Sequence, residues 1–315
     1  MGLEKTRALA NTIVGELERI VVGQRAVIEE MLLVVLAGGH ALLEGPPGTA
    51  KTLLARSLAG LLSIGFRRIQ FTPDLMPSDV VGTNVYDLSQ QKFTLRRGPI
   101  FTDVLLADEI NRAPAKTQAA LLEAMQERQV TVDGERMALA PTFSVFATMN
   151  PLEFEGTYPL PEAQLDRFLM KIVVGYPARD DERAILARYR DGLAPDDAVI
   201  RPVADGATLG AARAELLTVR ADDAVLAYAT DIVRRTRESP ACVVGASPRG
   251  SVALFLVARA RAALEGRDFV VPDDVKRMAP AVLRHRILLR PEAEIEGMTA
   301  DRAVRDIIDT VPVPR

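Results

Sequence analysis

Lys51 and Thr52 come directly after a loop rich in glycine and proline, and together they could bind phosphate groups. The apolar run 41–43 before this loop predicts a buried strand, and helical spacing resumes at Thr52. In such an arrangement the backbone N–H groups of the loop point inward and form a nest for an anion. Lys51 would reach the β- and γ-phosphates of a nucleotide, and the Thr52 hydroxyl would ligate Mg²⁺. The loop residues expected to bind the nucleotide are Gly45, Pro46, Pro47, Gly48, Thr49, Ala50, Lys51 and Thr52.

Ala50 stands where the phosphate-loop pattern G-x-x-x-x-G-K-[ST] has its last glycine. This position can be right-handed and helical, and a methyl group is then tolerated if the pocket has room for it. A strand, a turn and a helix with a chance lysine is the alternative interpretation of the segment. The motifs that follow along the chain argue against that alternative.

Two acidic residues, Asp108 and Glu109, follow the apolar run 101–107. The carboxyl ends of parallel strands meet at the edge of the sheet where ligands bind, so both side chains would face the phosphate loop. Asp108 would hold Mg²⁺ through water, and Glu109 would polarise the attacking water. Adjacent acids are common by chance, but a pair at a strand end downstream of a phosphate loop predicts phosphoryl transfer to water.

Three further polar positions could complete the site, and each has a plain structural alternative. Asn150 follows the apolar run 142–148 and could hold the attacking water or sense the γ-phosphate, although it could also cap a turn or helix. Gly23 and Gln24 form a turn between two predicted helices upstream of the loop. The backbone of that turn could bind an adenine edge, and a simple interhelix turn is equally compatible with the sequence.

The composition excludes several other classes of chemistry. The chain has 315 residues, a net charge of −3, one cysteine and two histidines. These counts exclude an internal disulfide, and they argue against a zinc finger, a histidine-dependent nucleophile and a generally basic nucleic-acid surface. The longest apolar run, 31–43, is too short to span a membrane, so we expect a cytoplasmic protein.

The order of segments predicts an α/β domain followed by a helical one. Strands alternate with helices up to Tyr176, and we place the domains at 1–176 and 177–315. No further strand is expected after residue 180, where we predict helices at 180–190, 221–237, 249–264 and 272–283 and a short one at 207–213.

Two segments interrupt the α/β pattern with β-hairpin signals. The segment 80–95 is β-like on both sides of a polar turn, and 129–139 contains Asp133-Gly134, a strong two-residue turn signal. Hairpins that do not continue the core sheet often contact partners or substrates, although a loop without function would give the same pattern.

The motifs in this order resemble the AAA+ ATPases, and most closely the MoxR family. That family lies in the branch with an insert in helix 2, which also includes the ATPase subunits of magnesium chelatase. The Ala-Lys-Thr version of the phosphate loop is itself characteristic of the family. The resemblance covers about 22–288 and rests on the segments 45–52, 71–79, 98–101, 108–113, 147–151, 160–168 and 247–249.

The resemblance implies a fold and roles for individual residues. The fold is an AAA+ P-loop core with a parallel five-stranded sheet and β-hairpin inserts, followed by an all-helical lid domain. Asn150 matches sensor 1, and Arg167 matches the arginine finger that reaches the ATP of a neighbouring subunit. Arg249 matches sensor 2, acting in its own subunit or in the next. Gln70 matches a polar residue that orients the Walker B glutamate, Glu109.

The resemblance also implies cofactors, partners and a cellular role. The protein would hydrolyse ATP with Mg²⁺ in a homo-oligomeric ring, which the family makes a hexamer. The ring would remodel client proteins or insert a cofactor into them, usually with a partner bearing a von Willebrand factor A domain, and the client stays unidentified. Arg112 would lie at a subunit interface. A nucleic-acid motor or loader is the alternative, and the mixed charge of the second hairpin argues against it.

Overall fold

The computed structural model describes residues 3–89, 91–150, 157–193 and 199–314. Five parallel strands form the central sheet, in the order β2-β5-β8-β1-β9, which confirms the predicted five-stranded parallel sheet. The strands are β1 (Ala41–Glu44), β2 (Phe66–Gln70), β5 (Val104–Asp108), β8 (Ser144–Met149) and β9 (Met170–Val173).

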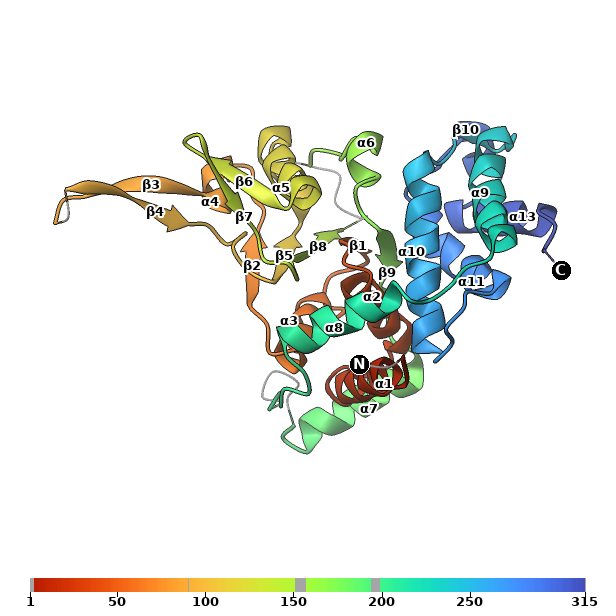
Figure 1. Ribbon diagram of the computed structural model, residues 1–315, viewed down its shortest axis with the longest axis horizontal. Helices are drawn as coiled ribbons and strands as arrows, with labels where there is room; N and C mark the ends of the chain where they lie inside the picture. Colours follow the sequence, from red (N-terminus) through yellow and green to blue (C-terminus); the bar gives the residue numbers. More distant parts are fainter. Residues whose placement is uncertain (1–2, 90, 151–156, 194–198, 315) are drawn as a thin grey trace.

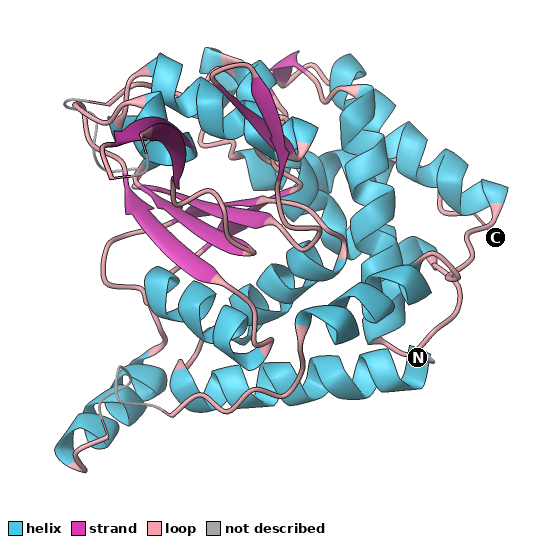
Figure 2. Cartoon of the chain, turned by 60° about the vertical axis from the view of Figure 1, so that its left-hand side comes forward, coloured by secondary structure: helices cyan, strands magenta, loops and turns pink. Residues whose placement is uncertain are grey.

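Helices cover both faces of this sheet (Figure 2). Neighbouring residues along a strand point to opposite faces, so Leu42 and Leu43 enter two different hydrophobic clusters. The same alternation places Leu105 and Leu106 on opposite faces. Burial on both faces explains why these strands are continuous apolar runs in the sequence. The helices of this half are α1 (Leu3–Ile20), α2 (Arg25–Leu36), α3 (Lys51–Leu61), α4 (Pro77–Val81), the 3₁₀ turn η1 (Ile110–Arg112), α5 (Ala115–Glu127) and α6 (Glu162–Leu165).

Both predicted hairpins are present. The strands β3 (Gly82–Asp87) and β4 (Lys92–Arg97) form a long arm that projects from the body (Figure 1). The strands β6 (Gln129–Val132) and β7 (Glu135–Ala138) form the second hairpin. Asp133 and Gly134 join β6 to β7 with φ of 49° and 87°, as a two-residue hairpin turn requires.

The chain after residue 176 is mainly helical, as predicted, with one exception. The strands β10 (Cys242–Val244) and β11 (Leu288–Leu289) form a short antiparallel pair that we did not expect. Strands of three and two residues are too short to show an alternating pattern. The helices are α7 (Arg179–Arg190), α8 (Gly206–Leu216), α9 (Asp223–Glu238), α10 (Pro248–Leu264), α11 (Pro272–Leu283), α12 (Pro291–Ile295) and α13 (Ala300–Thr310), the last two also unexpected.

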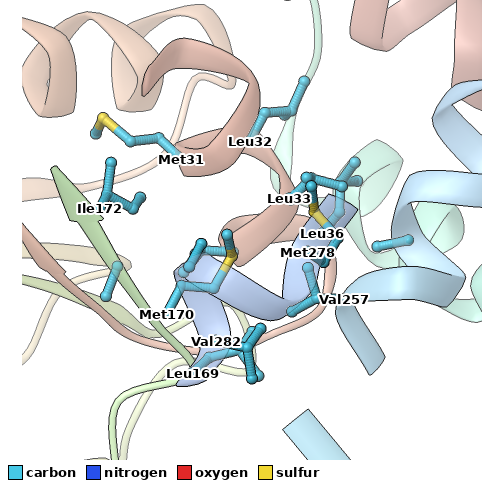
Figure 3. Close-up of a cluster of buried hydrophobic side chains, with 14 of the residues drawn as sticks. Met31, Leu32, Leu33, Leu36, Leu169, Met170, Ile172, Val257, Met278 and Val282 are labelled. Carbon is cyan, nitrogen blue, oxygen red and sulfur yellow. The ribbon is translucent and has the colours of Figure 1, made fainter. Parts of the chain in front are cut away.

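One hydrophobic cluster joins the two halves of the chain. Figure 3 shows Met31, Leu33 and Leu36 of α2 beside Met170 of β9 and Met278 of α11, and all five are buried. The α/β half and the helical half therefore share a core, and the division at residue 176 stays a prediction. Within the described residues, every helix is too short or too polar to cross a membrane.

Candidate nucleotide site

A cavity of about 520 Å³ lies where the phosphate loop and the ends of β5 and β8 come together. This volume is typical of pockets that bind small molecules. The predicted site residues that line it are Gln24, Pro47, Gly48, Thr49, Ala50, Lys51, Thr52, Asp108, Glu109 and Asn150. The cavity also has walls that we did not predict: Ile20, Val21, Val22, Leu53, Arg56, Thr148, Met149, Pro177, Ile185, Arg188 and Tyr189.

Lys51 begins helix α3 and folds back over the loop. Its ammonium group donates to the carbonyl oxygens of Gly45 and Pro46, at 2.8 Å each. Burial lowers the pKa of Lys51, while the nearby carboxylates of Asp108 and Glu109 oppose this shift. Gly45 and Pro46 therefore hold the lysine through their backbone without lining the cavity themselves.

The backbone at Ala50 contradicts our expectation of a right-handed conformation. Ala50 has φ 62° and ψ 20°, which is left-handed, and it directly precedes α3. A residue with a Cβ atom is strained in this region by roughly 1–2 kcal/mol. The position therefore has the conformation that a glycine would adopt without strain, and alanine occupies it at a cost in free energy.

The two acidic residues are held by different contacts. The backbone N–H of Glu109 donates to the Thr148 hydroxyl at 2.8 Å, and that hydroxyl donates to Asp108 Oδ1 at 2.5 Å. Glu109 is itself left-handed, with φ 56° and ψ 50°. Backbone strain of this kind is concentrated at functional sites. Thr148 links the acids to β8, a role that its place inside an apolar run did not reveal.

The glutamate carboxylate has two donors on one oxygen. Gln70 Nε2 donates to Glu109 Oε2 at 2.7 Å, the contact that the resemblance implied. Arg112 Nε lies 2.9 Å from the same oxygen, so Arg112 forms an ion pair with Glu109 in its own chain. An interface role for Arg112 stays a prediction.

The oxygen ligands present suit Mg²⁺ bound together with phosphate. The Thr52 hydroxyl and the Asp108 carboxylate both border the cavity. Among the described residues, His, Cys, Asp and Glu side chains form no group of three or more that could hold a metal. Mg²⁺ commonly takes only one or two protein ligands and completes its shell with phosphate oxygens and water. The donor set therefore fits a metal that arrives with a nucleotide.

The turn between α1 and α2 closes one end of the cavity against α7. Gln24 is buried, and its Nε2 donates to the carbonyl of Gly175 at 3.0 Å. Gly23 has φ 75° and does not line the cavity, although Gln24 does. Arg188 of α7 donates to the carbonyl of Ile20 at 3.1 Å. The first helix of the second half is thus attached to the expected adenine end of the site.

Arg167 and Arg249 lie outside this cavity. Arg167 Nη1 donates to the carbonyl of Leu122 in α5 at 2.9 Å, beside a separate hollow of about 230 Å³. Arg249 is exposed in the first turn of α10. The structure therefore does not bring either arginine to the loop of its own chain.

A partly buried polar link connects the segments that carry the two arginines. Asp166, next to Arg167, accepts from Ser247 Oγ and from Arg286 Nε, both at 2.8 Å. Ser247 in turn caps α10, the helix that carries Arg249. Burial lowers the pKa of Arg286 to about 10, and the charge of Arg249 adds to this shift. This link could not be predicted from local sequence patterns, because its three members are far apart along the chain.

Comparisons with known proteins agree with this geometry. Residues 40–170 match the model of the ATPase family associated with various cellular activities (AAA), and residues 234–307 match that of the AAA lid domain. The protein YeaC of Bacillus subtilis (strain 168) is 47% identical and covers 99% of this chain and 97% of its own. Chaperone MoxR1 of Mycobacterium tuberculosis is 42% identical, with coverage of 95% and 81%.

A solved structure has the same architecture. The crystal structure of a protein from Cytophaga hutchinsonii, assigned as an ATPase, superposes with a TM-score of 0.90 at 38% identity and covers 99% of this chain and 97% of its own. The five-stranded parallel sheet, the phosphate loop and the helical lid define the nucleotide-binding AAA+ class. Within that class, the extent of identity to MoxR proteins shows that this chain belongs to the MoxR family.

Proposed function

We propose that this protein binds ATP with Mg²⁺ and hydrolyses it to ADP and phosphate. The observation that carries the proposal is that Lys51, Thr52, Asp108, Glu109 and Asn150 border one cavity although they come from three separate segments. Phosphoryl transfer needs little covalent chemistry from a protein, and it depends on positioning and on neutralisation of charge. These side chains supply both.

Each residue has a distinct part in the proposed reaction. Lys51 neutralises charge on the β- and γ-phosphates, and Thr52 and Asp108 hold the metal, which supplies further charge neutralisation when it is bound. Glu109 orients and polarises the attacking water, and Asn150 holds that water or senses the γ-phosphate. The turn of Gly23 and Gln24 binds the adenine end, with Gln24 lining the cavity and Gly23 shaping the turn.

We also propose that the active form is a ring, with six subunits as in the family resemblance. Arg167 and Arg249 lie outside their own cavity, on segments that the Asp166–Ser247 hydrogen bond connects, which supports a site completed by the next subunit. An arginine supplied by a neighbour neutralises the charge that develops on the transferred phosphoryl group.

The proposed work of the ring is chaperone-like remodelling or cofactor insertion, in the cytoplasm and with a von Willebrand factor A domain partner. The arm β3–β4 supports this proposal because it presents apolar side chains at its surface. Leu88 and Phe93 are 84% and 70% exposed, and Phe93 stacks edge-on with Tyr86 at 5.2 Å. Exposed apolar patches mark surfaces that bind proteins.

Purified variants test the reaction. We expect Lys51→Ala to abolish nucleotide binding, and Lys116→Ala, which changes an exposed lysine of α5, to behave like the wild type. We expect Glu109→Gln to retain ATP binding and to lose turnover by about 10²-fold or more. Turnover at the wild-type rate in Glu109→Gln would refute the role of Glu109.

The same Glu109→Gln variant tests the cellular role. An ATP-bound ring that cannot hydrolyse should retain its client and its partner during affinity purification. We expect a von Willebrand factor A domain protein to co-purify in the presence of ATP and to be lost with Lys51→Ala. Recovery of nucleic acid instead of protein would contradict the proposal.

A further inference from the structure

A continuous chain of polar contacts joins the two acidic residues through strand β2. Arg68 donates to Asp108 Oδ2 from Nε at 3.0 Å and from Nη2 at 2.6 Å. Arg68 Nη2 also donates to Gln70 Oε1 at 2.6 Å. Gln70 Nε2 then donates to Glu109 Oε2 at 2.7 Å. The metal ligand and the water-polarising residue are therefore connected through two side chains of one strand.

The strand geometry makes this connection possible. Arg68 and Gln70 are two residues apart, so they project from the same face of β2. Gln70 lies opposite Asp108 in the parallel register, and Arg68 lies opposite Leu106. Arg67 projects from the other face, is exposed, and has no part in these contacts. A neighbouring arginine thus provides a matched control within the same strand.

Arg68 determines which way the Gln70 amide points. A guanidinium can only donate hydrogen bonds, and a carboxylate can only accept them. Only one orientation of the amide satisfies both neighbours, with the oxygen toward Arg68 and the NH₂ group toward Glu109. Arg68 therefore fixes the donor that Gln70 presents to the glutamate.

We propose that Arg68 competes with Mg²⁺ for Asp108, and that Gln70 helps to hold the guanidinium at that carboxylate. The inference rests on the proposed function, because it concerns the metal of the same site. Gln70 is itself held in place, because its NH₂ group donates to Glu109 Oε2 at 2.7 Å. Asp108 cannot keep a guanidinium and a divalent cation at one carboxylate without repulsion between the two positive charges.

The ion pair between Arg68 and Asp108 is exposed on the arginine side, as expected for a contact that breaks when a metal binds. The Arg68 side chain is 48% exposed, whereas that of Asp108 is 15% exposed. Arg68 can move into solvent and regain hydration, and Asp108 stays in the site for the metal. When Arg68 leaves, the Gln70 amide loses the neighbour that fixes its orientation.

The test measures metal affinity and does not depend on turnover. Mn²⁺ replaces Mg²⁺ as the probe, and its binding to the protein with ADP is followed by electron paramagnetic resonance. We expect Arg68→Ala to bind Mn²⁺ about three- to fivefold more tightly than the wild type, because a partly exposed competing ion pair is removed. Arg67→Ala should match the wild type. Affinity in Arg68→Ala equal to that in Arg67→Ala, or weaker, would overturn the proposal.

A double-mutant cycle tests the connection through Gln70. We expect Gln70→Ala to tighten Mn²⁺ binding by about twofold, because Arg68 loses one of its two acceptors. In the Arg68→Ala background, Gln70→Ala should then have no further effect. Independent effects of the two changes would refute the connection, since they would show that Gln70 does not act on the metal site through Arg68.

The outcomes separate this inference from the proposed function. A wild-type protein without an ADP-dependent Mn²⁺ site would refute nucleotide and metal binding at this cavity, and the inference would fall with it. A normal Mn²⁺ site that is unaffected by Arg68→Ala would refute the inference alone. Thermal unfolding and ADP affinity measured without metal show that the variants are folded, and we expect both to match Arg67→Ala.

Discussion

The cavity and the surface that carries Arg167 and Arg249 differ in how many parts of an ATPase site each contains. The cavity gathers the loop, both acids and Asn150 from segments that fold against one another within one chain. Arg167 and Arg249 are joined through Asp166 but lie outside that cavity. The difference agrees with our proposal that a complete site needs two copies of the chain, one supplying the cavity and the other the arginines.

The largest effect should follow from the loss of Arg167. We expect Arg167→Ala to bind ATP as the wild type does and to lose about 10³-fold in ATPase rate, because arginine fingers contribute this much or more in related reactions. Arg234→Ala, which changes an exposed arginine of α9, is the control. Steady-state phosphate release gives both rates. A wild-type ATPase rate in Arg167→Ala would show that Arg167 has no role in the reaction.

Arg249 should contribute less than Arg167. We expect Arg249→Ala to lower the ATPase rate by about tenfold to a hundredfold, as loss of one charge-stabilising donor commonly does. Arg234→Ala again serves as the control. If Arg249→Ala lost ATP binding in a monomeric preparation, Arg249 would act in its own subunit, and the comparison between the two regions would no longer hold.

Mild acid should weaken the contact between β8, whose end borders the cavity, and α5, whose Leu122 carbonyl holds Arg167. His40 is buried, accepts from the backbone N–H of Val145 in β8 at 3.0 Å, and donates to the carbonyl of Met125 in α5 at 3.2 Å. Burial, with the charge of Arg128 adding to it, lowers the pKa of His40 to about 3. The contribution of His40 to stability is therefore complete above the unfolded pKa of about 6.5 and is lost as the pH falls toward 3.

Urea unfolding at pH 7 and pH 5 measures this dependence. His40 alone should lower the free energy of unfolding by up to about 1.4 kcal/mol for each pH unit below 6.5. His285, also buried with its pKa lowered, should add to the slope. We expect His40→Gln to be less stable at pH 7 but to show a smaller loss between the two pH values. An unchanged slope would contradict the buried neutral form of His40.

The smallest effect concerns the loop alone. Ala50→Gly should raise the free energy of unfolding by up to about 1 kcal/mol, because glycine relieves the left-handed strain but loses more entropy on folding. Gly48→Ala is the opposite change, at φ 78° with no atom within 4 Å of the added Cβ, and should lower stability by about 1 kcal/mol. Urea midpoints give both values. Loss of stability in Ala50→Gly would contradict the strain.

The sequence predicted the parts of the site that depend on local order. A strand, a loop and a helix around Lys51, and two acids after a buried strand, are recognisable because neighbouring residues carry the signal. The right-handed backbone predicted for Ala50 was wrong, because a loop with a right-handed residue here and one with a left-handed residue have the same sequence pattern. Asn150 lines the cavity, as expected because the strand ends of a parallel sheet share one edge, and its role there stays a prediction.

Contacts between distant segments were not predictable in this way. Arg68 is an exposed arginine on a short strand, and nothing in its surroundings along the chain distinguishes it from Arg67. Asp166 meets Ser247 and Arg286 only after the helical half has packed on the sheet. Such contacts follow from the fold, and the sequence pattern records only which residues are available for them.

Mixing two inactive variants tests the shared site most directly. Lys51→Ala lacks the nucleotide loop but keeps Arg167, and Arg167→Ala has the opposite defect. When rings containing both are formed, each Lys51→Ala subunit can supply its arginine to an intact loop of the next subunit. We predict that ATPase activity returns and is highest at intermediate mixing ratios. Rings shown by co-purification of two tags to contain both variants, yet inactive at every ratio, would contradict a site shared between subunits.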